Sequence, residues 1–280
     1  MNFKICELSL VCVRKDASED SLMTSQLLFG EIVMVLTVHE SWYYIRSIID
    51  HHEGWVIAAQ LKDFELEKAN LKANYCLDLV NIITVENENI PVLIGSNLFQ
   101  YDGMSFKHGI KKFFYNGSIV NPEKTDPNSK LAQKLVLKYL NSPYLFGGKS
   151  PFGIDASALV QMVYRLMGIY IPRYHFEQVK NGENVEFYTN AQLGDLVFFD
   201  DERGTIIHVG MLIGDGQIIH VHDKVRIDPI DMYGIIDANT QKYIYKSRII
   251  KRLLPTEEHI PGVIVEKNNS DLAQTSIFEN

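Results

Sequence analysis

The first 65 residues alternate short apolar runs with polar turns. The apolar runs lie at residues 8–14, 26–36, 42–47 and 53–56. Strands this closely spaced, with turn residues between them, are typical of a small β-barrel. A similar pattern continues from about residue 70 to 124, with runs at 90–96 and 115–120 around a Tyr101-Asp102-Gly103 turn. The pattern therefore predicts two consecutive all-β modules, followed by a polar linker at residues 121–128.

Beyond the linker the hydrophobic period becomes helical. Residues 131–140 carry apolar side chains at helical spacing, and a second helix is predicted from Asp155 to about Met167, where Gly168 ends it. Strands follow at residues 195–199, 208–213, 217–221 and 243–253. Helices followed by an antiparallel sheet predict an α+β domain. The expected divisions are 1–66, 67–126, 127–255 and a polar tail at 256–280.

Composition narrows the class of protein. The net charge of −8 comes from dispersed carboxylates, and no basic run interleaved with aromatics appears, so nucleic acid is not an expected partner. No stretch reaches the roughly 20 apolar residues of a membrane span. The N-terminus lacks the pattern of a secretion signal, which favours a cytoplasmic protein. Three cysteines without paired spacing argue against a zinc site, and neither a metal nor a cofactor is expected.

Ordered motifs in the third segment carry a specific resemblance. Tyr144-Leu-Phe-Gly-Gly148 is followed by Gly153-Ile-Asp-Ala-Ser-Ala-Leu-Val-Gln161, Pro172-Arg173, Leu193-Gly-Asp-Leu-Val-Phe-Phe199, His208-Val-Gly-Met-Leu-Ile-Gly214 and His220. This series resembles the papain-like NlpC family of cell-wall peptidases, and the first 65 residues resemble a bacterial SH3-like domain. The resemblance implies a papain-like NlpC domain behind two small SH3-like barrels, on the scaffold of γ-D-glutamyl-L-diamino acid endopeptidases. It also implies a peptidoglycan-derived peptide as the partner.

The family's chemistry requires a cysteine at the first turn of a helix, where the helix dipole and a nearby histidine stabilise the thiolate. Asp155 is the expected N-cap of that helix. By resemblance His208 is the base, and His220 is expected to orient it. With a three-residue Gly214-Asp215-Gly216 loop, Gly210 would oppose His220, and both histidines would share one face. The same register would place His222 opposite His208, so His222 is the alternative orienting residue.

The nucleophile position is occupied by Ala156, whose methyl group cannot attack a carbonyl. Loss of such a nucleophile costs on the order of 10⁶ in turnover. Ser157 is turned roughly 100° around the helix and is a poor substitute. Two origins of Ala156 stay open: a laboratory Cys-to-Ala change, or natural loss. Natural loss is favoured because Phe146 and Ala158 also depart from the family pattern.

Further residues are candidates for substrate binding. By resemblance, Asp155 and Ser157 would contact the free amino terminus of the peptide, and Tyr144 would point towards the oxyanion. Arg173 is a candidate clamp for a carboxylate. Tyr174 and His175 replace smaller family residues and would narrow the pocket. The resulting hypothesis is a hydrolytically silent murein-peptide binding protein, and the alternative is an active cysteine endopeptidase of peptidoglycan recycling captured as an engineered variant.

Overall fold

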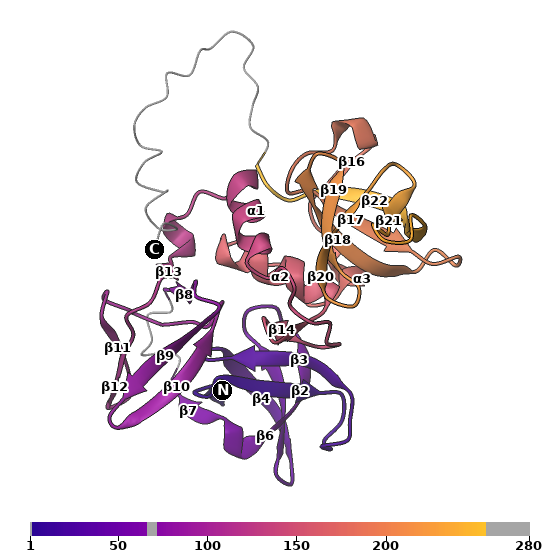
Figure 1. Cartoon of the computed structure of the whole chain (residues 1–280). Helices are drawn as coiled ribbons and strands as arrows, with labels where there is room; N and C mark the ends of the chain where they lie inside the picture. Colours follow the sequence, from indigo (N-terminus) through magenta and orange to yellow (C-terminus); the bar gives the residue numbers. More distant parts are fainter. Residues whose placement is uncertain (1, 66–71, 256–280) are drawn as a thin grey trace, which may run out of the picture.

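The computed structural model describes residues 2–65 and 72–255. The predicted polar tail lies outside these residues. Three bodies follow one another along the chain in Figure 1: two β modules and a mixed body of helices and sheet. The order of elements confirms the expected change from all-β to α+β after the linker.

The first module is a seven-stranded antiparallel sheet with the strand order β3-β2-β6-β5-β4-β1-β7. Its elements are β1 (Phe3–Ile5), β2 (Leu10–Arg14), β3 (Met23–Leu28), β4 (Ile32–His39), β5 (Trp42–Ser47), β6 (Glu53–Ile57), a 3₁₀ turn at Ala58–Gln60 and β7 (Lys62–Phe64). The pairing among residues 2–65 runs from β3 at one end to β7 at the other, which is an open order and not a closed barrel.

The apolar run at 26–36, expected to be one strand, is two strands. Gly30 interrupts it with a backbone φ of +79°, a left-handed conformation that side chains disfavour. A Cβ at this position would lie 1.9 Å from the backbone oxygen of Asn97 in the second module. The break at Gly30 therefore brings the two β modules into close backbone contact.

The second module contains a four-stranded sheet and a separate two-stranded pair. Its elements are β8 (Tyr75–Cys76), β9 (Val80–Val85), β10 (Glu88–Leu93), β11 (Ser105–His108), β12 (Lys111–Phe114), β13 (Ile119–Val120) and a 3₁₀ turn at Pro122–Lys124. Phe29 of the first module packs into its core against Phe106 and Phe113. The second module is thus all-β as expected, while its likeness to an SH3 domain stays a prediction.

The third body begins with two helices, α1 (Ser129–Leu137) and α2 (Ala156–Leu166), joined through the short pair β14 (Lys149–Ser150) and β15 (Gly153–Ile154). Asp155 caps α2 by accepting a hydrogen bond from the Ala158 amide at 2.8 Å, as predicted. Gly168, with a φ of +82°, follows the helix end. Every residue of α2 is buried, so this helix forms the centre of the main hydrophobic core.

The sheet of this body has the strand order β16-β22-β17-β18-β19-β20, with β21 paired to β22. Its elements are α3 (His175–Gln178), β16 (Glu183–Val185), a 3₁₀ turn at Tyr188–Asn190, β17 (Leu196–Asp200), β18 (Ile206–Gly214), β19 (Gln217–Val221), β20 (Val225–Pro229), β21 (Gly234–Ile236) and β22 (Tyr243–Arg252). The helix α2 packs against β18 and β19. The fold class α+β is therefore confirmed for this body.

The β18–β19 hairpin has the expected register but a different turn. Gly210 opposes His220, as predicted, yet Gly214 pairs with Gln217, which leaves a two-residue turn of Asp215 and Gly216. An irregularity between Leu212 and Gly214 adds the residue that the shorter turn removes. The β-bulge thus restores the register that a three-residue loop had been expected to provide.

The first module and the α+β body share buried polar contacts. Glu31, which is 1% exposed, accepts hydrogen bonds from Arg165 of α2 and, at 3.2 Å, from the ammonium of Lys149. The backbone amide of Lys149 donates to the side chain of Gln26 at 2.8 Å. Gln161 of α2 donates to Asp50 at 3.0 Å. These contacts place one face of the first module directly beside α2.

Candidate functional site

The candidate nucleophile position is the first residue of α2. Ala156 is 8% exposed and directly follows the N-cap, Asp155. Its methyl group therefore stands at the helix terminus where a cysteine would feel the positive end of the dipole. Ala156 thus occupies the first position of α2, and its side chain carries no group that could act as a nucleophile.

Hydrogen bonds hold this helix start beside the β19–β20 turn. The Tyr144 amide donates to the carbonyl of Asp223 at 2.9 Å, and the Ile154 amide donates to the carbonyl of Pro143 at 3.0 Å. The Val225 amide donates to the Ser142 carbonyl at 2.8 Å. The segment before α2 is thereby fixed to the end of the strand that carries His220.

His208 and His220 form a buried pair. The His208 Nε2 and His220 Nδ1 atoms are 3.0 Å apart, and the two side chains are 5% and 0% exposed. His222, the alternative orienting residue, is solvent-exposed and is hydrogen-bonded through Nδ1 to the Tyr245 hydroxyl at 3.0 Å. His220 is therefore the residue that contacts His208.

Asp228 extends the pair into a relay, which the sequence analysis had missed. Its carboxylate lies 2.8 Å from His220 Nε2 and is fully buried. Arg226 holds the same carboxylate through two nitrogens, at 2.7 and 2.8 Å. The strand pattern contained the signal, because His220 opposes Arg226 in the β19–β20 ladder and Asp228 lies two residues further on the same face.

Tyr245 of β22 packs flat on the His208 ring, with centroids 4.0 Å apart and an interplanar angle of 11°. Strand alternation places His208 on the face of β18 that also carries Leu212, while Val209 on the other face joins the α2 core. The imidazole is thus clamped between strands of the sheet. Sequence alone had given no reason to choose Tyr245, which lies 37 positions beyond His208.

Burial sets the protonation of this relay. It lowers the pKa of His208 well below the usual histidine range, and nearby His220, His175 and His222 add to this shift. Burial also lowers the pKa of His220, although Asp228 opposes it. For Asp228, burial raises the pKa, but hydrogen bonds from His220, the Ala238 amide and Arg226 outweigh it and leave the pKa at about 2. Near neutral pH, the relay is two neutral rings and a carboxylate.

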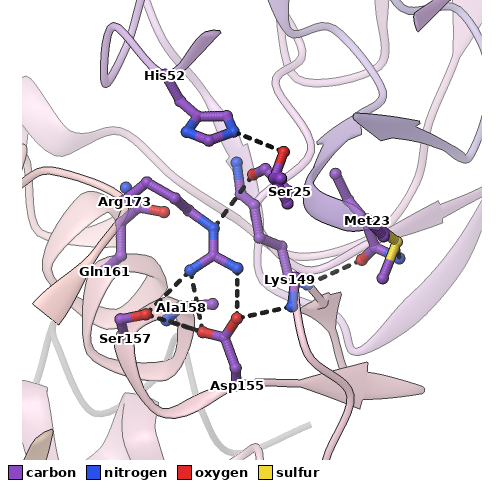
Figure 2. A network of polar contacts seen from close by, with 12 residues as sticks. Met23, Ser25, His52, Lys149, Asp155, Ser157, Ala158, Gln161 and Arg173 are labelled. Atoms are coloured by element: carbon purple, nitrogen blue, oxygen red, sulfur yellow. Dashed lines mark hydrogen bonds and ion pairs between the residues drawn. The ribbon is translucent and has the colours of Figure 1, made fainter. Parts of the chain in front are cut away.

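Arg173 is not a free clamp. Its two terminal nitrogens bind the two oxygens of Asp155 at 3.0 and 2.6 Å, and the side chain is 1% exposed. Figure 2 shows this fork between Asp155 on one side and Ser25 of the first module on the other, where Nε donates to the hydroxyl at 3.2 Å. The hydrogen-bonding groups of Arg173 are therefore occupied inside the protein.

Ser157 belongs to the same network. Its hydroxyl donates to Asp155 at 3.0 Å and accepts from Arg173 at 3.0 Å. The Ser157 hydroxyl is therefore engaged by Asp155 and Arg173 inside the protein. The ion pair with Arg173 and the cap on the Ala158 amide also help to hold the pKa of Asp155 below its usual value, against the opposing effect of burial.

Tyr174 and His175 lie beside the first module and the sheet. Tyr174 meets the ring of His52 edge to face at 5.4 Å and stacks on Phe176 at 5.2 Å. His52 also contacts the Thr24 hydroxyl at 3.1 Å. The first module thus contributes His52 to the margin of the site, a residue that no motif had indicated.

Electrostatic effects connect these groups. Burial and the charge of Asp155 both raise the pKa of Tyr144, whose side chain is 48% exposed. Burial lowers the pKa of His175, which Asp155 partly offsets. Burial raises the pKa of Tyr245, and Tyr144 adds to that rise. The predicted residues are therefore close enough to influence one another's charge.

Within residues 2–65 and 72–255, no group of three His, Cys, Asp or Glu side chains is arranged to bind a metal ion. A separate cavity of about 500 Å³ lies between the two β modules, with Phe64, Phe99 and Phe106 in its lining. The histidine relay does not line that cavity.

Among the helices of the described segments, none is long and apolar enough to cross a membrane.

Comparison with known proteins identifies the class. Residues 141–246 match the NlpC/P60 family, and residues 13–61 match the bacterial dipeptidyl-peptidase SH3 domain. The chain is 38% identical over 228 residues to the gamma-D-glutamyl-L-lysine dipeptidyl-peptidase of Bacillus subtilis, covering 72% of this chain and 73% of that protein. The chain therefore belongs to the NlpC/P60 family, and its first module is SH3-like.

Other similar proteins cover different parts. A gamma-D-glutamyl-L-lysine dipeptidyl-peptidase of Bacillus cereus is 38% identical over 113 residues, which is 38% of this chain and 34% of that protein. The crystal structure of an NlpC/P60 family protein from Bacillus cereus superposes with a TM-score of 0.77 at 22% identity, covering 90% of this chain and all of that one. The fold of the three bodies together thus has a solved counterpart.

Proposed function

We propose that this protein binds peptidoglycan-derived peptides of the L-Ala-γ-D-Glu-diamino acid type and does not hydrolyse them. The observation that supports the proposal is Ala156 at the first position of α2, where the family resemblance expects the nucleophile, in a chain that also has the buried His208–His220 pair. The name of the Bacillus subtilis relative, a gamma-D-glutamyl-L-lysine dipeptidyl-peptidase, supplies the peptide class. Because residues 127–280 contain no cysteine, no other thiol of that segment is available to attack the amide.

The binding site in this proposal spans two bodies. Tyr144 with its exposed ring, Tyr174 and His175 would contact the peptide from the α+β body, and His52 would do so from the SH3-like module. Asp155, Ser157 and Arg173 support that surface as a neutralised internal network. A free amino terminus would therefore meet tyrosine and histidine groups, because the Asp155 carboxylate is already paired.

The direct test is calorimetry with L-Ala-γ-D-Glu-L-Lys, combined with chromatography of the same mixture after prolonged incubation. We expect measurable binding and an intact tripeptide. No heat at millimolar peptide would instead support a protein whose groove has closed. Cleavage by the unaltered chain would overturn the proposed silence.

A second candidate is an active cysteine endopeptidase of peptidoglycan recycling in which a cysteine at position 156 was exchanged for alanine in the laboratory. The complete relay of His208, His220 and Asp228 favours it, since these groups serve a thiol. In the Ala156→Cys variant, turnover of the tripeptide would support this candidate. Continued lack of turnover would support a naturally remodelled pocket.

We also propose that the protein is located in the cytoplasm. The peptide class named for the relatives fits a protein that meets released wall fragments in the cytoplasm. Fractionation of the source cells with an antibody against the chain tests it. Recovery of the protein with the wall fraction would contradict this location.

A further inference from the structure

Asp228 determines the direction of every hydrogen bond in the relay. Its carboxylate is contacted by Arg226 through two nitrogens and by the Ala238 amide at 2.9 Å, all of which are donors. A carboxylate only accepts hydrogen bonds. The His220 Nε2 atom, 2.8 Å away, must therefore carry a proton and donate it to Asp228.

The state of His208 follows from that of His220. A neutral imidazole has one protonated nitrogen, so His220 Nδ1 has a lone pair and accepts. The atom 3.0 Å from it, His208 Nε2, must be the donor. His208 Nδ1 is then left without a proton. Burial keeps both rings neutral, because it lowers the pKa of each.

We propose that Asp228 is a positioning residue that acts through His220 to hold His208 as the Nε2–H tautomer, which leaves Nδ1 unprotonated and able to accept a hydrogen bond. This inference rests on the proposed function, which places a wall peptide beside the start of α2. Tyr245 fixes the plane of the ring by stacking on it. Arg226 in turn fixes Asp228 and keeps it ionised.

The same hydrogen-bond arrangement could serve two chemical roles. In the chain as it stands, the unprotonated Nδ1 would be available to accept a hydrogen bond from an N–H of a bound peptide. With cysteine in place of Ala156, the thiol proton would move from Sγ to Nδ1, leaving a thiolate and an imidazolium. Asp228 would stabilise that positive charge through His220. No other reactant is needed for this proton transfer.

The decisive measurement uses the unaltered protein. Long-range ¹H–¹⁵N spectra of ¹⁵N-histidine-labelled chain at pH 7 distinguish the two tautomers of each ring. We expect His208 and His220 both to be neutral and protonated at Nε2. A His208 ring protonated at Nδ1, or an equal mixture of tautomers, would overturn the proposal whether or not any peptide binds.

A matched pair of variants tests the role of Asp228. Asp228→Asn removes one charge from the relay, and Asp215→Asn removes one charge from the exposed tip of the β18–β19 hairpin, where asparagine tolerates the positive φ. We expect Asp228→Asn to give mixed His220 tautomers and Asp215→Asn to leave the spectrum unchanged. Unchanged tautomers in folded Asp228→Asn would count against the positioning role.

The same pair in an Ala156→Cys background separates positioning from binding. For the L-Ala-γ-D-Glu-L-Lys tripeptide, we expect Asp228→Asn to lower kcat by about 10- to 100-fold, with KM changed less than twofold. Asp215→Asn should change neither. Equal kcat values would overturn the proposal. If the Ala156→Cys protein cleaves nothing, the second candidate function fails, while the tautomer spectra still decide the role of Asp228.

Discussion

At the scale of single residues, the site depends on charges that are paired away from water. Asp155 and Arg173 neutralise each other beneath the start of α2, where each would be costly alone. Asp228 and Arg226 do the same beneath the histidines. Both carboxylates are thus paired with an arginine inside the protein.

Loss of Arg173 tests this pairing. We expect Arg173→Met to lower the free energy of unfolding by about 3–5 kcal/mol, because Asp155 would remain buried without its cation. Arg203→Met, in an exposed turn, is the control and should change it by less than about 0.5 kcal/mol. Urea denaturation followed by circular dichroism measures both. A cost of Arg173→Met no greater than the control would contradict the pairing.

Histidine burial predicts an acid-sensitive stability. Burial lowers the pKa of His208 and His220, and it lowers that of His52 to about 4. The unfolded chain then binds more protons than the folded one once pH falls below about 6.5, so stability is full above that value and declines towards pH 4.

The two carboxylates with the lowest pKa values contribute little in this window. Asp228 and Asp50, with pKa values of about 2 in the folded chain, lose stability only below about pH 4. We therefore expect His52→Asn to reduce the slope of unfolding free energy against pH between 6.5 and 4.5 by up to one proton. His39→Asn, at an exposed position, should leave the slope unchanged, and equal slopes in both variants would refute the assignment.

At the scale of elements, several local features around the candidate site were predictable from the sequence. The N-cap at Asp155, the glycine stop at Gly168 and the pairing of Gly210 with His220 follow from local rules of capping and alternation. The β-bulge near Ile213 was not predictable, because nothing in the local sequence distinguishes a three-residue loop from a two-residue turn with a bulge. The two arrangements give the same register for His220.

The partners that come from another body were also unpredictable. Asp228 could have been found by extending the strand alternation one hairpin further. Glu31 and His52 could not, since their contacts with Arg165 and Tyr174 span more than a hundred positions and depend on how the modules dock. The break in the run at residues 26–36 was unpredictable for the same reason, because the chain turns at Gly30 where it approaches the backbone of Asn97 in the second module.

Gly30 gives a prediction at this scale. An added Cβ would meet the Asn97 oxygen at 1.9 Å, and φ is +79°, so we expect Gly30→Ala to destabilise the protein by more than about 3 kcal/mol. Gly109, with a φ of +58° and nothing within 4 Å, is the matched control and should cost about 1 kcal/mol. Thermal melts that rank the two variants equally would contradict the close approach.

At the scale of the whole molecule, Glu31 makes one of the buried contacts that link the SH3-like module to the α+β body. One carboxylate is hydrogen-bonded to Arg165 of α2 and to Lys149 of β14. Burial is nearly complete for all three side chains. The SH3-like module is therefore attached to α2, the helix that begins at Ala156, and to β14 shortly before it.

We expect Glu31→Gln to destabilise both the SH3-like module and the α+β body. It removes the carboxylate to which two buried cations are hydrogen-bonded, and we expect a loss of about 3–5 kcal/mol together with a broader unfolding transition. Glu19→Gln, in an exposed turn, is the control. Differential scanning calorimetry measures both effects. A sharp transition at the unaltered temperature would show that the attachment does not depend on this contact.

The buried carboxylate of Glu31 also bears on how such a chain can be inherited. A domain that can be exchanged freely has a solvated interface without buried charges, and its loss leaves the rest of the chain folded. Here Lys149 and Arg165 are encoded in one segment of the gene and Glu31 in another. Recombination between the two segments would therefore leave both buried cations without Glu31. The SH3-like module and the α+β body are therefore expected to tolerate separate exchange poorly, because each supplies part of one buried ion cluster.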